Sequence, residues 1–287
     1  MKNLFTSAIA AITLVFSGTT QAQTKSLKLE NSLLWEVSGN GLSKLSYLYG
    51  TIHSICPTDY FLTEKTKKAF QKSDKLIIEI NFSDPNEIAD AQKLAISPEL
   101  LSKKLTPEQL SKLDSILQKA IGIKVQQVDN LNLATVMSLI TIKTFDCEIL
   151  KSYESDFTDL ALKEKKGVSG FETVKGQLNM LSNAYTDSEL IESLADASKA
   201  ETKKMVEDYK NENLMDLYGD LANEKVMSKK TKKFILDDRN RDWVKKMKDM
   251  MKNEALFVAV GSAHLAGEEG VINLLRNAGY KVKPVMN

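Results

Sequence analysis

Leu48-Tyr49-Gly50-Thr51-Ile52-His53 is an apolar strand pattern that runs directly into a Gly-x-x-His segment. The same design recurs in Val260-Gly261-Ser262-Ala263-His264, and these two segments hold the only two histidines of the sequence. A Gly at the end of a buried strand lets the backbone turn sharply and approach its neighbours closely. The following His is then aimed into the crevice beyond the strand ends, where ligands gather in α/β folds. We therefore expect the two strands to be neighbours in one sheet, with both imidazoles facing one cavity.

Further strands and helices are predicted on either side of these segments. Residues 33–37 and 46–49 flank Ser38-Gly39-Asn40-Gly41, a hairpin signal because Asn and Gly accept positive φ angles. Thr106-Pro107-Glu108-Gln109 places a cap, a Pro and a Gln where a helix begins, and Gly122 ends that helix. Apolar periodicity predicts strands over residues 76–80, 167–171, 256–260 and 280–285, and helices over residues 64–71, 131–145, 156–166, 187–210, 229–252 and up to 277.

This order of elements indicates the fold class. Strands at both ends with helices between them predict an α/β (α+β) fold with a central mixed sheet, built from N- and C-terminal segments and covered by helices. We expect one domain over residues 23–287, with a helical insert over about residues 86–165 and 174–253.

The first 22 residues have the layout of a secretory signal peptide. Lys2 precedes an apolar run over residues 8–16, and small residues follow up to Ala22. The run is too short to cross a bilayer core of about 30 Å, so we expect cleavage, no stable membrane span afterwards, and a periplasmic or extracellular location. An uncleaved anchor is the alternative. Because 39 basic residues nearly balance 38 acidic ones, no long-range field favours nucleic acid as a partner.

Cys56 and Cys147 are the only cysteines. Export to an oxidising compartment favours a disulfide between them, with two buried free thiols as the alternative. Cys56 also lies three residues after His53, but a single thiol is a weak signal for a zinc site.

Glu79 adds a carboxylate to the two histidines. It follows three aliphatic residues in a predicted buried strand, where an ionised carboxylate needs a cation, a metal ion or several hydrogen-bond donors. Imidazoles are the commonest metal ligands, and two of them with one carboxylate leave coordination positions open for water. Glu79 is thus a candidate ligand, a candidate general base, or one half of a structural salt bridge.

Two further places carry candidate residues. Glu172 follows the predicted strand over residues 167–171, and Asp237-Asp238-Arg239-Asn240-Arg241-Asp242-Trp243 lies in a predicted helix. Arg239 and Arg241 cannot both face the same way on that helix, so at most one points inward. Such an Arg is able to hold Glu172 or Glu79, or to stabilise an oxyanion; exposed pairing with Asp238 and Asp242 is the alternative.

The ordered segments resemble the motif series of the TraB/GumN family. Those segments are residues 48–53, 77–79, Gly170-Phe171-Glu172-Thr173, residues 239–243, and residues 260–267 followed by Gly270. The family is similar to the Tiki proteases, which depend on divalent metals, and more distantly to erythromycin esterase and a haem-binding lipoprotein. Phe171 and Ala266 depart from the Leu and Pro that are usual at their positions, and both changes are apolar.

The resemblance implies a function. It implies an exported, metal-dependent hydrolase that cleaves peptides. The metal ion, Mn, Co or Zn, is then bound by His53, His264 and Glu79. The catalytic residues are then Glu79, Glu172, Arg239 and Asn240. Its partner is then a peptide or another small substrate. The alternative is a non-catalytic protein that binds a peptide, a metal or haem in the same pocket. The sequence predicts no oligomeric state.

Overall fold

The computed structural model describes residues 29–223 and 227–286, so the predicted signal peptide at residues 1–22 lies outside the described part of the chain. Across those two ranges, six strands form one mixed sheet in the order β4-β3-β5-β2-β1-β6. The strands are β1 (Leu34–Ser38), β2 (Ser46–Thr51), β3 (Lys75–Ile80), β4 (Gly167–Glu172), β5 (Leu256–Gly261) and β6 (Lys281–Pro284). The predicted α/β class is confirmed.

Parallel pairing in the sheet brings the two Gly-x-x-His segments together. β4, β3, β5 and β2 are mutually parallel, so their carboxyl ends share one edge. β5 lies between β3 and β2, and the register pairs Gly50 with Val260 and Thr51 with Gly261. The hairpin strand β1 and the C-terminal β6 add antiparallel pairs on the other side of β2. The expectation that these distant strands are neighbours is met.

Helices fill the sequence between the strands. Several of them differ from the sequence-based prediction. The helix expected over residues 187–210 is broken because Ser198 caps a new helix, and the helix expected from residue 156 begins at Tyr153 because Ser152 caps it. The helix expected over residues 229–252 contains a π-helical turn, and the one expected over residues 131–145 is shorter at both ends. The helices are α1 (Glu64–Gln71), α2 (Pro85–Ala95), α3 (Leu101–Lys104), α4 (Pro107–Ile121), α5 (Leu133–Ile142), α6 (Tyr153–Lys163), α7 (Val174–Ala184), α8 (Asp187–Asp196), α9 (Lys199–Lys210), α10 (Leu214–Ala222), α11 (Lys229–Lys232), α12 (Asp238–Met250) and α13 (Val271–Asn277), with the short turns η1 (Val125–Gln127), η2 (Lys233–Asp237, a π-helix) and η3 (Ser262–His264). None of the helices within the described ranges is long and apolar enough to cross a membrane.

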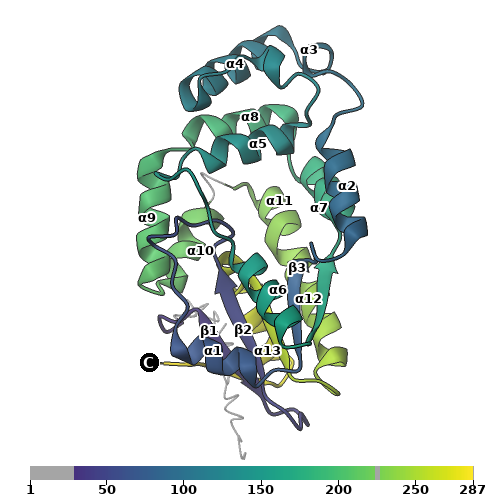
Figure 1. The fold of residues 1–287 in the computed structure, drawn as a ribbon, viewed down its shortest axis with the longest axis vertical. Coiled ribbons are helices and arrows are strands. Elements are labelled where there is room, and N and C mark those ends of the chain that lie inside the picture. The colour runs from purple at the N-terminus through teal and green to yellow at the C-terminus, as the bar shows by residue number, and fades with distance from the viewer. Residues whose placement is uncertain (1–28, 224–226, 287) are drawn as a thin grey trace, which may run out of the picture.

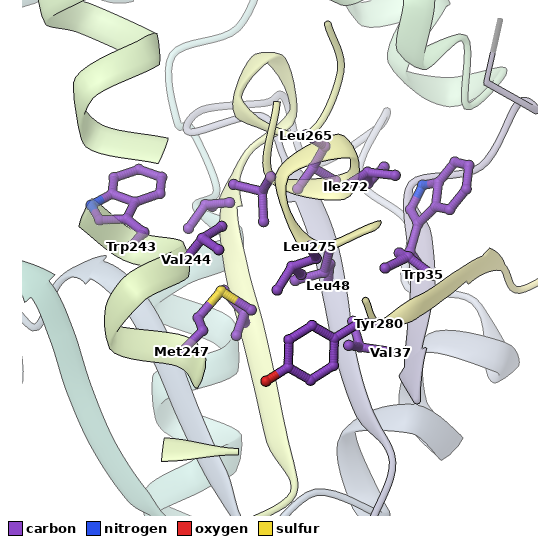
Figure 2. Packing of buried hydrophobic residues seen from close by; sticks show 14 of the residues in the cluster. Trp35, Val37, Leu48, Trp243, Val244, Met247, Leu265, Ile272, Leu275 and Tyr280 are labelled. Atoms are coloured by element: carbon purple, nitrogen blue, oxygen red, sulfur yellow. The ribbon is translucent and has the colours of Figure 1, made fainter. Parts of the chain in front are cut away.

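Each face of the sheet has its own apolar core. Side chains alternate along a strand, so Leu48 and Val258 face one side while Tyr49 and Phe257 face the other. α12 and α13 cover the first face, where Figure 2 shows Trp243, Val244 and Met247 against the sheet. α1 and α6 cover the second face. Burial on both sides accounts for the continuous apolar runs of β3 and β5.

A third apolar core lies among helices alone. It joins α3, α4, α5 and α8 through buried leucines, valines and isoleucines. Figure 1 places this helical layer beyond the end to which the β2 arrow points, which is the edge of the sheet where both Gly-x-x-His segments lie. The capping box of Thr106 and Gln109 and the left-handed Gly122 bound α4 as predicted.

Cys56 and Cys147 form a disulfide, as the sequence favoured. Its Cα atoms are 5.9 Å apart, and it joins the segment after β2 to the segment before α6. A cysteine in a disulfide has no thiolate to bind a metal ion, so the alternative of metal binding by Cys56 does not apply.

Removal of this disulfide is expected to destabilise the fold. The two cysteines are 91 residues apart, so their bond constrains a long loop of the unfolded chain. A Cys56→Ser/Cys147→Ser variant should lose about 2–4 kcal/mol of unfolding free energy, measured by urea denaturation of the oxidised proteins. Equal denaturation midpoints for the variant and the parent protein would contradict this expectation.

Candidate functional site

The candidate site lies where β2, β3 and β5 end, and two glycines let its parts approach closely. A Cβ on Gly50 would lie 3.1 Å from the Ser262 Cα, so a side chain there would push the two Gly-x-x-His turns apart. A Cβ on Gly261 would lie 3.2 Å from His53 Nε2 and 3.3 Å from Glu79 Oε1. The space between the ring and the carboxylate therefore depends on the missing side chain of Gly261.

Glu79 is the centre of the site. It is buried at the end of β3, and each of its oxygens has a separate set of neighbours. Oε1 accepts a hydrogen bond from the Gly261 N–H at 2.9 Å and lies 3.8 Å from His53 Nε2 and 3.9 Å from His264 Nε2. Oε2 accepts hydrogen bonds from Arg239 Nη2 at 2.5 Å and from Gln177 Nε2 at 3.1 Å. Both imidazoles thus converge on a single carboxylate oxygen.

Arg239 joins three strand ends through one guanidinium group. Nε and Nη2 donate to the two oxygens of Glu172, Nη2 also donates to Glu79, and Nη1 approaches His264 Nε2 at 3.1 Å. The π-helical turn η2 ends at Asp237, two residues before Arg239, and Nη1 donates to the Ile235 carbonyl in that turn at 2.9 Å. π-helical turns of this kind are frequent at functional sites.

Glu172 holds Arg239 in place. Its Oε1 accepts from Arg239 Nε and from the Trp243 indole N–H, both at 2.8 Å. The guanidinium also lies over the Trp243 ring, 4.8 Å from its centroid. Because both oxygens of Glu172 are engaged in this way, we expect Glu172 to act through Arg239 rather than on a substrate.

His264 is a buried ring whose protonated nitrogen can be assigned. Asn240 donates its amide to the Glu269 carbonyl, which can only accept, so the Asn240 Oδ1 faces His264 Nδ1 at 2.7 Å. The proton therefore sits on Nδ1, and the Nε2 lone pair faces Arg239 and Glu79. Trp243 packs against the ring with centroids 4.4 Å apart.

His53 is the exposed counterpart of His264. Its side chain is 63% exposed, against 6% for His264. Nδ1 lies 2.9 Å from Glu154 Oε1, and Nε2 faces Glu79. Since a carboxylate accepts, Nδ1 carries a proton here too, and the two rings present their Nε2 atoms to the same place.

Burial and charge move the site's pKa values in different directions. Burial raises the pKa of Glu79, but the neighbouring His264 and His53 rings, the Arg239 guanidinium and the Gly261 N–H together hold it well below its usual range. Burial and the nearby Arg239 charge lower the pKa of His264 to about 3, against the influence of Glu79.

The pKa of His53 is shifted in the opposite direction from that of His264. Desolvation opposes its protonation, but the hydrogen bond to Glu154 and the charge of Glu79 raise the pKa of His53 to about 9. His53 is thus the more readily protonated of the two rings.

The structure brings the predicted residues His53, Glu79, Glu172, Arg239 and His264 into one connected network, with Asn240 holding His264 from behind. Arg241 points away and pairs with half-buried Asp238 and Glu269.

Sequence reasoning missed Glu154 and Gln177, each in the first turns of a helix. Ser152 was the available signal for Glu154, because it is a good N-cap two residues before that carboxylate.

A model of the TraB/PrgY/gumN family matches residues 33–284. The chain belongs to this family. It is similar to the metalloprotease TIKI1 of Danio rerio, with 21% identity over 313 residues that cover 88% of this chain and 63% of TIKI1. The chain thus spans less than two thirds of the length of that relative. No solved structure matches it significantly.

The donor chemistry of this family member fits a divalent cation. His53 Nε2, His264 Nε2 and Glu79 Oε1 face one another, and the hydrogen bonds on both Nδ1 atoms leave the Nε2 atoms as the ligating positions. Arg239 Nη1 faces the lone pair of His264 Nε2, so the Arg239 side chain has to move before an ion can bind there. In the part of the chain that the structure describes, no three His, Cys, Asp or Glu groups are already placed to hold an ion.

Neutral, buried His264 should make stability depend on pH. Its folded pKa of about 3 lies below the ordinary 6.5, so between these values the unfolded chain binds a proton that the folded ring does not. The contribution of the neutral His264 ring to the free energy of unfolding is complete above pH 6.5 and is lost as the pH falls toward 3. With chelator present, the parent protein should lose about 2 kcal/mol more unfolding free energy between pH 6.5 and 5 than His264→Gln. Parallel pH profiles in urea denaturation would rule this out.

Proposed function

We propose that this chain is an exported, metal-dependent hydrolase that cleaves peptide bonds. The observation that carries the proposal is the convergence of two imidazole Nε2 atoms on Glu79 Oε1, beside the cation of Arg239. The likeness to a metalloprotease supports peptides as the substrate class. The disulfide supports an oxidising location.

His53, His264 and Glu79 are the residues that would hold the ion. When bound, a divalent cation lowers the pKa of a water molecule and polarises a carbonyl group. The chain keeps Glu79 ionised, and a carboxylate with so low a pKa is a better ligand than a general base near pH 7. Asn240 keeps the His264 Nε2 lone pair available by holding the proton on Nδ1.

Arg239 supplies positive charge beside the two histidines and Glu79. Glu172 and Trp243 hold its guanidinium, and Nη1 is the nitrogen that faces the His264 ring. A positioned guanidinium stabilises the oxyanion that forms when a peptide carbonyl is attacked. An ion on His264 Nε2 would displace Nη1, so the hydrogen bonds from Nε and Nη2 to Glu172 are what would keep this charge beside the site.

A cleft in the helical layer offers room for a substrate. It has a volume of about 790 Å³ and is lined by residues of α5, α8, α9 and α10. The residues of the candidate site do not line it. α10 contributes Leu217 and Asp220 to the cleft and also packs against η3, which carries His264.

The direct test is metal analysis combined with peptide cleavage. The purified protein should bind Mn, Co or Zn and cleave a peptide library, and chelation should abolish cleavage until the metal is restored. His264→Ala and Arg239→Ala should each reduce turnover by about 10²-fold or more. Arg241→Ala is the matched control, because Arg241 is on the same helix and points away.

Two outcomes would contradict the proposal. Unchanged metal content in a His53→Ala/His264→Ala variant would remove the metal from the site. Ligand binding that survives in Glu79→Gln, in a protein with no turnover to lose, would favour the binding-protein alternative.

Gly261→Ala tests the space between His53 and Glu79. The backbone at Gly261 has φ −49° and ψ 133°, which alanine adopts, so the added methyl affects the site rather than the turn. That methyl would lie 3.2 Å from His53 Nε2, and we expect at least a tenfold loss of turnover with a circular dichroism spectrum like that of the parent. Gly219→Ala is the control, because a Cβ there meets nothing within 4 Å. Full activity in Gly261→Ala would show that the space is not needed.

A further inference from the structure

Glu154 lies outside every motif of the sequence, yet it is the direct partner of His53. It occupies the second position of α6, and its side chain is only 17% exposed. Oε1 accepts from the Thr51 hydroxyl at 2.6 Å and faces His53 Nδ1 at 2.9 Å, while Oε2 accepts from the Ser152 hydroxyl at 2.9 Å. Two neighbouring hydroxyls and the positive end of a helix thus orient this carboxylate independently of its contact with His53.

We propose that Glu154 is the positioning residue of His53, which keeps a proton on Nδ1 and holds Nε2 toward Glu79. His53 needs such a partner because packing does not hold it. His264 is enclosed by Trp243 and Asn240, whereas more than half of the His53 side chain is open to water. A ring that rotates freely would present either nitrogen to the site, and a carboxylate on Nδ1 removes that freedom.

The backbone around Glu154 is tied to the backbone around His53. Ile55 and Lys151 form an antiparallel bridge with hydrogen bonds of 3.0 and 2.8 Å in the two directions. The disulfide from Cys56 to Cys147 adds a covalent link between the same two segments. These ties account for the arrival of Glu154 beside a His that is 101 residues away in sequence.

The test uses the ring N–H signals of the two histidines in ¹⁵N-labelled protein without metal. With only two histidines in the sequence, each ring is identified by its loss in His53→Gln or His264→Gln. In the parent protein both Nδ1–H protons should be protected from exchange. Glu154→Ala should abolish the protected His53 signal, and the isosteric Glu154→Gln should speed its exchange by about tenfold, because a neutral acceptor bonds more weakly.

Two controls separate positioning from general loosening. The His264 signal should be unchanged in each Glu154 variant, because Asn240 holds that ring independently. Asp159→Asn removes a charge from an exposed position of the same helix and should change neither signal. The proposal is overturned if the His53 signal persists unchanged in Glu154→Ala and Glu154→Gln, or if both rings lose their signals together.

This inference concerns the site of the proposed hydrolase, and its importance for turnover rests on that proposal. The spectra require neither a metal ion nor a substrate. A protein without peptidase activity can therefore still give the expected signals, and an active peptidase can fail to give them.

Discussion

The ion pairs of Arg239 are the interaction on which the rest of the site depends. Glu79 and Glu172 are largely buried at the ends of β3 and β4, and one guanidinium satisfies both. A buried carboxylate without a partner is strongly destabilising. Loss of Arg239 would therefore leave both Glu79 and Glu172 buried without a cation. The same group contacts the His264 ring at the end of β5. A single side chain from α12 therefore sets the charges at three strand ends, and every buried side-chain polar atom within the described residues has a partner.

The two histidines form an asymmetric pair built from one repeated motif. His264 is enclosed, neutral and held by an amide, whereas His53 is exposed, has a raised pKa and is held by a carboxylate. The first arrangement gives a rigid ring whose Nε2 already faces the network. The second gives a ring at the open side of the site, with more than half of its side chain exposed to water. Such a division places a fixed group and an accessible group around one carboxylate, as the proposed hydrolase would need in order to admit both an ion and a substrate.

The parallel strands of the sheet bring the residues of the candidate site together. Parallel β3, β5 and β2 end at the same edge, and β5 lies in the middle, so the groups after each strand meet without long loops. The helices between β3 and β4 and between β4 and β5 contribute Glu154, Gln177 and Arg239 from different directions. Membership of the TraB/PrgY/gumN family covers nearly all of this arrangement, from residue 33 to residue 284.

The sequence by itself determined the α/β class, the strands, the capping of α4 and the meeting of two distant Gly-x-x-His segments, because these follow from local periodicity and from the rarity of His and Gly at such positions. It also pointed to Glu79, Glu172 and Arg239, since charged groups next to apolar runs need partners.

Only the tertiary structure decided which partners they have. Glu154 and Gln177 resemble any surface residue in sequence, and they become part of the site because a disulfide, a backbone bridge and helix packing carry them there. The inward choice of Arg239 over Arg241 likewise depends on long-range packing, which short-range patterns do not encode, whereas the break at Ser198 follows from a local helix cap that the periodicity did not predict.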